Sequence, residues 1–144
     1  MNRKAVIKIN TMIYYDYAQT EKISAEHQGK YYEKESFYYL NYQEQDADTG
    51  ETITTTIRWQ NALPLQVVVL RQGAANAKNV FQEGLLDCSA YQTAEGDINI
   101  ETATERVEIY SDKLGGRLLA AYSLKMNSHS IGDYELVISY SFGD

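Results

Sequence analysis

The stretch EKISAEHQGKY, residues 21–31, decides how this 144-residue chain folds. Its polar positions are Lys22, Ser24, Glu26, Gln28 and Lys30, and the positions between them carry Ile23, Ala25, His27, Gly29 and Tyr31. Successive side chains of a β-strand point to opposite faces, so this period of two predicts a strand with one face in water.

The same alternation occurs in four further stretches. Their apolar or aromatic sets run from Ile7 to Tyr15, Ile53 to Trp59, Leu118 to Met126 and Tyr134 to Phe142. The chain also carries 13 tyrosines, a residue type that favours strands. Both observations indicate an all-β chain.

Turn signals come at short intervals between these stretches. They lie at Lys34 to Ser36, Asp46 to Gly50, Asn61 to Pro64, Gly73, Gly84, Glu95 to Asp97, Leu114 to Gly116 and Asn127 to Gly132. Such spacing predicts an antiparallel meander of about ten strands. Residues Ala74 to Glu83 are the best helical candidate, but we interpret their second half as a strand.

An open sheet of this length would leave two unpaired edges that invite aggregation. Closing the sheet removes both edges, and eight to ten strands enclose an interior that is packed or holds one small ligand. We therefore predict one domain, residues 1–144, folded as an up-and-down β-barrel of about eight to ten strands. A β-sandwich is the alternative, but it needs crossover connections longer than these loops.

Charge and cysteine content exclude several classes of protein. The 13 basic and 20 acidic residues give a net charge of −7, which disfavours nucleic-acid partners. The longest apolar run, Leu118 to Tyr122, is too short for a membrane helix or a signal peptide. Since the single Cys88 cannot form an internal disulfide, we expect a cytoplasmic protein without a membrane partner. We expect Cys88 itself to be buried.

An ordered set of short motifs resembles a known family. They are EHQGKYYEKESFYYLNYQE at Glu26 to Glu44, TTTI at Thr54 to Ile57, VVLRQG at Val68 to Gly73, FQEG at Phe81 to Gly84, YQTAEG at Tyr91 to Gly96, and GGR at Gly115 to Arg117. This set resembles the YwiB-like family of small bacterial proteins, a domain of unknown function. The resemblance implies a lipocalin-like, calycin-type barrel and a bacterial cytoplasm. It implies no established activity and no catalytic residues.

Arg71 is the first candidate binding residue. By period two it shares a face with Val67 and Val69. If that face lines the barrel, the buried guanidinium needs an anion. A ligand carboxylate would meet that need. The alternatives are a partner within the chain, such as Glu83 or Glu101, or a solvated position at the mouth.

Further polar or amphipathic residues lie on predicted strands. They are Tyr91, Thr93, Thr102, Arg106 and Tyr122. Those that face inward would give an apolar ligand its few oriented polar contacts. The alternative is ordinary packing of the wall, with each hydroxyl bonded to a neighbour.

No pattern indicates a catalytic residue, a metal or a cofactor. His27 and His129 are far apart and lack further ligands at zinc spacing. Residues Asp46 to Glu51 resemble half of a calcium loop, but Ile57 stands where the bidentate glutamate belongs. We interpret this segment as an acidic hairpin turn. Glycine-rich nucleotide motifs and Gly-x-Ser-x-Gly are absent from the sequence.

Three functional hypotheses remain. The first is a binding module that holds a small, partly apolar or carboxylate-bearing ligand inside the barrel. The second is a structural module with a filled barrel and a protein partner. The third is a hydrolase or isomerase that uses residues at the barrel mouth. A cavity of roughly 300 Å³ or more, lined by apolar side chains and a few polar groups, favours the first.

Overall fold

The computed structural model describes residues 2–74, 76–93 and 95–143, which form ten β-strands. They are β1 (Arg3–Tyr15), β2 (Thr20–Lys34), β3 (Phe37–Gln45), β4 (Thr52–Gln60), β5 (Gln66–Gly73), β6 (Ala77–Gln82), β7 (Leu86–Thr93), β8 (Gly96–Asp112), β9 (Gly115–Met126) and β10 (His129–Phe142). Within these residues, no helix has the length and apolar character needed to cross a membrane. The prediction of an all-β chain of about ten strands is confirmed.

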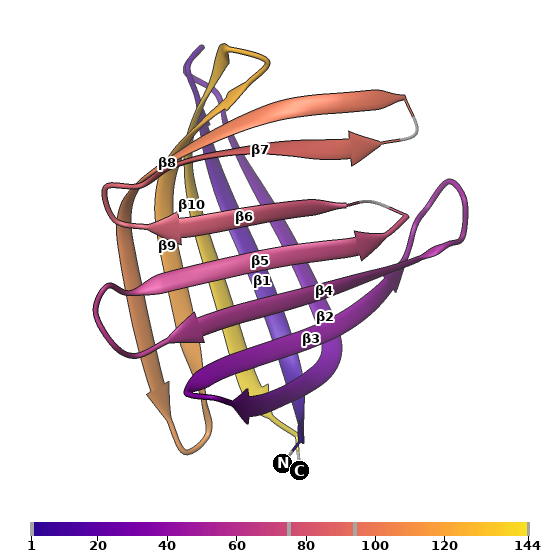
Figure 1. Ribbon diagram of the computed structural model, residues 1–144, viewed down its shortest axis with the longest axis vertical. Helices are drawn as coiled ribbons and strands as arrows, with labels where there is room; N and C mark the ends of the chain where they lie inside the picture. The colour runs from indigo at the N-terminus through magenta and orange to yellow at the C-terminus, as the bar shows by residue number, and fades with distance from the viewer. Residues whose placement is uncertain (1, 75, 94, 144) are drawn as a thin grey trace.

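All ten strands form one antiparallel sheet in the order β6-β5-β4-β3-β2-β1-β10-β9-β8-β7. Strands adjacent in the chain therefore pair in turn, except β6 and β7, which are the two ends of the order. The pair β1–β10 joins the two ends of this meander, with Ala5 opposite Phe142. The predicted up-and-down barrel is thus confirmed, and both chain ends lie at one end of it (Figure 1).

The barrel is nearly closed, because the ladder is interrupted between β6 and β7 (Figure 1). One isolated bridge among the described residues joins Asn76, directly before β6, to Gln92 of β7, where the Gln92 N–H donates to the Asn76 carbonyl oxygen at 3.1 Å. Closer to the turn, Asp87 Oδ2 accepts the Val80 N–H at 2.9 Å. A carboxylate therefore replaces one backbone acceptor at this seam.

Two long strands give the barrel two layers. β2 and β8 pass from one layer into the other, so that β4, β5 and β6 cross over β1, β9 and β10 (Figure 1). Gly29 of β2 pairs with both β1 and β3, and a Cβ atom there would collide with the Asn41 carbonyl oxygen. In β8 the pairing with β9 skips Glu105, a β-bulge of the kind that bends a strand.

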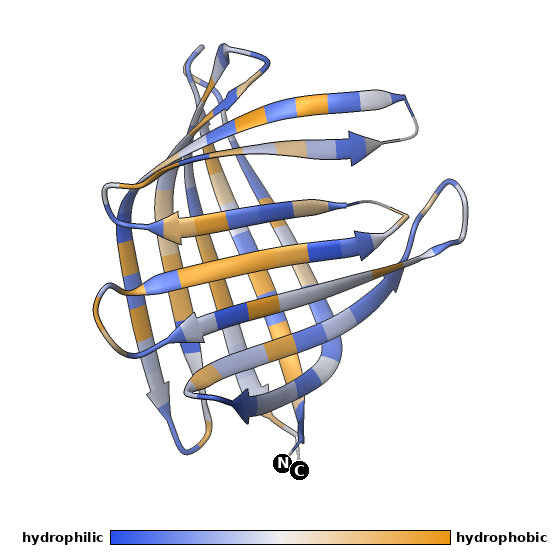
Figure 2. Ribbon diagram, in the orientation of Figure 1, coloured by the Kyte–Doolittle hydropathy of each residue, from blue (hydrophilic) through white to orange (hydrophobic). Residues whose placement is uncertain are grey.

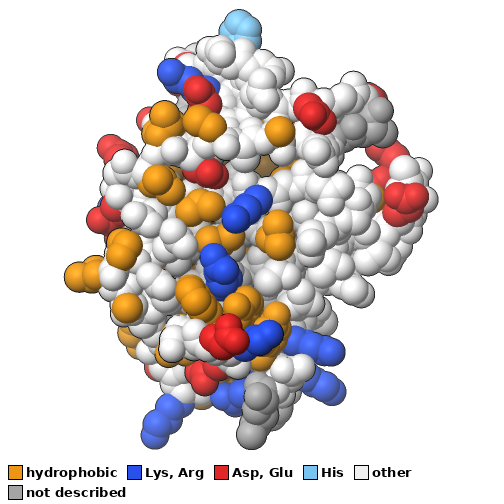
Figure 3. Space-filling model, viewed as in Figure 1, with side chains coloured by type: hydrophobic (Ala, Val, Ile, Leu, Met, Phe, Trp, Pro, Cys, Tyr) orange, Lys and Arg blue, Asp and Glu red, His pale blue; other side chains and the backbone are white. Residues whose placement is uncertain are grey.

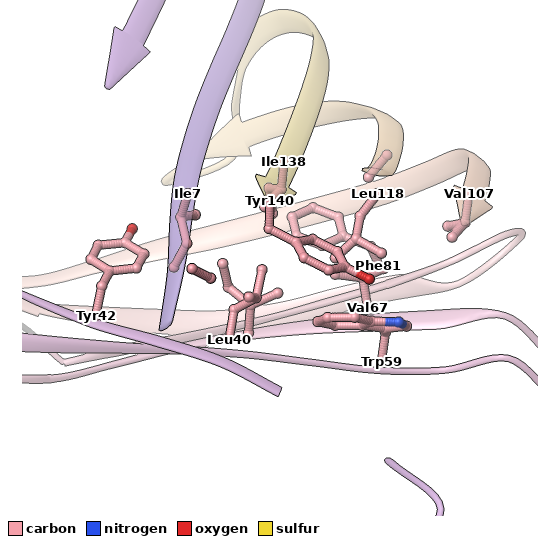
Figure 4. Packing of buried hydrophobic residues seen from close by; sticks show 13 residues of the cluster. Ile7, Leu40, Tyr42, Trp59, Val67, Phe81, Val107, Leu118, Ile138 and Tyr140 are labelled. Atoms are coloured by element: carbon pink, nitrogen blue, oxygen red, sulfur yellow. The ribbon is translucent and has the colours of Figure 1, made fainter. Parts of the chain in front are cut away.

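The middle of the barrel is packed with apolar side chains from both layers. Apolar positions alternate with polar ones along most strands (Figure 2), and Ile7, Leu40 and Trp59 are at most 1% exposed. Figure 4 shows Ile7 and Leu40 lying between Tyr42 on one side and Trp59 on the other. Burying each such side chain contributes about 1.5–3 kcal/mol, so this layer holds the two sides together.

Two local predictions are wrong. Cys88 is exposed rather than buried, because its neighbour Asp87 pairs with the fully buried Thr102 and so occupies the inner face of β7. The predicted turn over Asn127 to Gly132 is shorter than expected, since β10 begins at His129.

Candidate functional site

Five aromatic side chains meet at the end of the barrel where β2 and β10 finish. We call this cluster, Tyr31, Tyr38, Trp59, Tyr140 and Phe142, the aromatic end. The Tyr31 ring centroid lies 5.6 Å from that of Tyr140 and 5.0 Å from that of Phe142. The Trp59 centroid lies 5.8 Å from that of Tyr38 and 5.4 Å from that of Tyr140. Alternation along four strands thus brings the rings onto one inner surface.

A pocket of about 530 Å³ opens at the aromatic end. Four of the rings line it, and Trp59 is buried behind them with 1% of its surface exposed. The remaining lining residues are Arg3, Glu33, Ser111, Asp112 and Lys113. This combination of aromatic walls and a few polar groups is typical of small-molecule sites.

Two tyrosine hydroxyls of this pocket, those of Tyr31 and Tyr140, keep their protons at neutral pH because their pKa is raised. Burial raises the pKa of Tyr140 to about 12, and burial together with a hydrogen bond to Glu33 raises the pKa of Tyr31. The Tyr31 hydroxyl donates to Glu33 Oε1 at 3.0 Å. The Tyr38 and Tyr140 hydroxyls donate to none of the described residues. Both therefore remain donors for a ligand.

The opposite part of the inner wall is polar, and we call its residues, His27, Tyr42, Glu44, Thr55 and Arg71, the polar end. Arg71 Nη2 lies 3.1 Å from Glu44 Oε1, and each side chain is about one-third exposed. Arg71 pairs across the sheet with Thr55, which is 1% exposed, so Arg71 lies on the inner face, the condition on which its candidacy as a binding residue depended. The His27 and Tyr42 rings stack at 4.0 Å.

Arg71 has a partner within the chain, but the two partners that we considered are wrong. The partner is Glu44, which the ladders β3–β4 and β4–β5 bring near it. Glu83 is occupied elsewhere, since its Oε1 accepts the Val107 N–H at 3.1 Å. The guanidinium is therefore neutralised without any ligand.

The other predicted residues are spread over both faces of the wall. Tyr91 is half-buried and Thr102 is fully buried. The Tyr122 ring lies between Phe81, at 4.7 Å, and Tyr134, at 5.2 Å. Arg106 is half-exposed and pairs with Glu108 at 3.1 Å. The side chain of Thr93 lies outside the described part of the structure.

Arg106 and Tyr122 line one common pocket of about 480 Å³ at the β8 bulge. Its other residues are Tyr14, Glu105, Ala121, Asp133, Tyr134 and Glu135. Arg71, Tyr91 and Thr102 do not line it. The predicted set therefore does not form a single site.

The acidic turn at Asp46 forms as predicted. Asp46 Oδ2 accepts hydrogen bonds from the Thr49 N–H and the Thr49 hydroxyl at 2.9 and 3.0 Å, and these bonds lower the pKa of Asp46. Across the described residues, no three His, Cys, Asp or Glu side chains are grouped to hold a metal ion.

The residues of the aromatic end were missed by the sequence analysis. Tyr31, Tyr140 and Phe142 were recognised only as members of alternating sets. The signal that was present is the position of these rings next to predicted turns or the chain end. Alternation gives the inner face of a strand, but it does not tell which strand ends meet.

An antiparallel ten-stranded barrel, packed at its middle and open at an aromatic end, is the class of protein that this geometry defines. The chain matches the family described as a domain of unknown function (DUF1934) over residues 7–138, and it belongs to that family. The uncharacterized β-barrel protein YwiB of Bacillus subtilis (strain 168) is 26% identical over 115 residues, which cover 80% of this chain and 78% of that protein.

The crystal structure of the ywiB protein from Bacillus subtilis has the same fold. It matches with a TM-score of 0.83 at 24% identity, over 99% of this chain and 94% of that chain. The resemblance to the YwiB-like family is confirmed, and so is the barrel. Neither the family description nor the name of the relative assigns an activity.

Proposed function

We propose that this protein is a binding module for a small molecule with a flat or apolar body, which it holds at the aromatic end. The observation that carries the proposal is the pocket of about 530 Å³ formed by Tyr31, Tyr38, Tyr140 and Phe142. Its volume exceeds the roughly 300 Å³ at which ligand pockets begin. The packed middle of the barrel argues for a ligand at the mouth rather than deep inside.

The rings supply a binding surface at low entropic cost. Tyr31 is stacked on Tyr140, and Phe142 contacts both rings edge-on. Because neighbouring rings already hold them, little side-chain freedom is lost when a ligand is bound. Stacking on such rings contributes about 0.5–1.5 kcal/mol per aromatic pair beyond the burial of area.

The single tryptophan of the chain offers a direct test, because Trp59 lies behind the pocket. We would titrate the protein with N-phenyl-1-naphthylamine, a neutral probe made of a naphthalene and a phenyl ring, and follow Trp59 emission and probe fluorescence. Saturable binding with quenching of Trp59 is the expected result. Native mass spectrometry of the purified protein would in parallel detect a ligand that co-purifies.

Two neighbouring tyrosines on β3 provide a matched pair of variants. Tyr38 lines the pocket, whereas the adjacent Tyr39 stacks on Tyr32 at 4.7 Å, away from the pocket. Tyr38→Ala should weaken probe binding about tenfold, which corresponds to roughly 1.4 kcal/mol, and Tyr39→Ala should leave it unchanged. Equal losses in both variants, or no binding of any ring-bearing probe, would refute the proposal.

A filled barrel that binds a protein partner is the second candidate. Leu114, beside the pocket residue Lys113, favours it because this apolar side chain is 78% exposed. Leu114→Ser separates the two candidates. It should leave N-phenyl-1-naphthylamine binding intact if the pocket is the functional site, while a protein partner docked on this turn would be released.

A further inference from the structure

The charges of this acidic protein are unevenly distributed. Its net charge is −7, yet Lys and Arg side chains gather at the end where both chain termini lie (Figures 1 and 3). The basic residues at the aromatic end are Arg3, Lys4, Lys30, Lys34, Arg58, Lys113 and Arg117. The acidic residues there are Glu33, Glu35 and Asp112. Of the charged residues that line the pocket itself, Arg3 and Lys113 are basic and Glu33 and Asp112 are acidic. The lining is therefore balanced in charge, whereas the whole chain is acidic.

The acidic residues that line the pocket already bind protein groups. Glu33 accepts the Tyr31 hydroxyl, and Asp112 Oδ1 accepts the Leu114 and Gly115 N–H groups at 2.8 and 3.1 Å. Hydrogen bonds of this kind fix both carboxylates in place and partly satisfy their charge.

The lysines of this end have no such partners. Lys34 and Lys113 form no ion pair with any described residue, whereas Arg71 and Arg106 elsewhere in the barrel both do. Lys113 lines the pocket directly. Arg3, which also lines it, holds its guanidinium 3.7 Å from the centre of the Phe142 ring. The rim of the pocket thus carries Lys113, which has no ion-pair partner among the described residues, above an aromatic floor.

The pocket also offers hydrogen-bond donors beneath this rim. The Tyr38 and Tyr140 hydroxyls donate to none of the described residues, and burial keeps Tyr140 protonated by raising its pKa to about 12. Neutral hydroxyls and ammonium groups both bind anionic oxygens.

We infer that the ligand of the aromatic end is a small anion, in which a flat ring lies on the tyrosines and a phosphate, sulfate or carboxylate group is held at the rim by Lys113. This inference rests on the proposed function and adds the charge of its ligand. A long polyanion such as a nucleic acid does not fit, because Asp46, Asp48 and Glu51 and the other acidic loops would repel it.

A pair of probes that share one ring system tests the inference. 8-Anilinonaphthalene-1-sulfonate carries one sulfonate that N-phenyl-1-naphthylamine lacks. The sulfonate probe should bind about fivefold more tightly or better, and added salt should weaken the binding of this probe only. Both titrations use the full chain and the same Trp59 signal.

Two double variants with the same charge change complete the test. Lys34→Gln with Lys113→Gln should lower the affinity for the sulfonate probe about fivefold and leave the neutral probe unaffected. The control is Lys22→Gln with Lys125→Gln, which alters exposed lysines at the other end of the long strands and should affect neither probe. All four lysines are exposed, so folding is preserved.

The outcomes separate the inference from the proposed function. Equal affinity for the two probes, or equal losses in the two double variants, would overturn the anionic ligand while the pocket stands. Failure of both probes to bind would remove the proposed function and the inference with it.

Discussion

The aromatic end and the polar end share the strands β3 and β4. β3 carries Tyr38 at one end and Tyr42 and Glu44 at the other, and β4 carries Trp59 and Thr55. At the polar end the charges of Glu44 and Arg71 satisfy each other at 3.1 Å. At the aromatic end the Tyr38 and Tyr140 hydroxyls and the Lys113 ammonium line a pocket, and none of the three has a hydrogen-bond or ion-pair partner among the described residues. The comparison teaches that a charged residue on an inner wall indicates a ligand only when its neighbours leave it unpaired.

The largest expected effect concerns the packed floor of the aromatic end. Trp59→Ala should lower the free energy of unfolding by about 3–5 kcal/mol, since it leaves a cavity where four strands meet. Urea denaturation followed by circular dichroism measures this loss. Tyr39→Ala is the control and should cost about 1 kcal/mol or less. A loss in Trp59→Ala no larger than in the control would mean that this end is not a packed platform.

A medium effect concerns the inner wall at β8, where Thr102 pairs with Asp87 of β7 and Leu124 of β9. The Thr102 Oγ1 is buried without a hydrogen-bond partner among the described residues. Thr102→Val should therefore raise the free energy of unfolding by about 1 kcal/mol, because it removes an unsatisfied polar atom.

Thr56 provides the matched control for that substitution. Its hydroxyl accepts a hydrogen bond from Asn41 Nδ2 at 2.9 Å, so Thr56→Val should lower stability by about 1 kcal/mol. Thermal unfolding of both variants measures whether each substitution raises or lowers the stability of the protein. A loss of stability in Thr102→Val as well would show that the inner wall is hydrated rather than dry.

The smallest effect concerns the charge pair of the polar end. Glu44→Gln should lower the free energy of unfolding by at most about 1 kcal/mol. The Glu44 and Arg71 side chains are each about one-third exposed, so solvent screens their ion pair. High salt should reduce this difference further. Measurement at low and high salt, with Arg71→Gln and the double variant, gives the coupling energy. A coupling of several kcal/mol would mean that the polar end is closed to solvent.

The period-two alternation predicts most of the fold. It gives the strands, the meander and the face that Arg71 shares with Val67 and Val69, because these depend only on side-chain direction and turn position. It fails for Cys88, since the inner position on β7 belongs to Asp87, whose oxygen bonds across the open seam to Val80. The hydrogen bond between Asp87 and Val80 forms because the backbone ladder between β6 and β7 is interrupted there. The alternation within a single strand does not show where the sheet is interrupted.

The candidate site was far less predictable. Glu44 and Arg71 are 27 positions apart, and their contact depends on the register of two ladders. The aromatic end likewise requires that the end of β2 lies beside the end of β10, which follows from closure through β1. The alternation along one strand identifies the rings that face inward. The pairing of β1 with both β2 and β10 is what brings these rings around one pocket.

The pairing of β1 with β10 has a practical consequence for handling this protein. Both chain ends lie beside the aromatic end, and the Gly143 N–H donates to the Lys4 carbonyl oxygen at 3.0 Å. An affinity tag or fusion partner attached at either terminus would emerge next to the pocket and add its own charges there. Surface immobilisation through the exposed thiol of Cys88 on β7 would instead leave the mouth facing the solution.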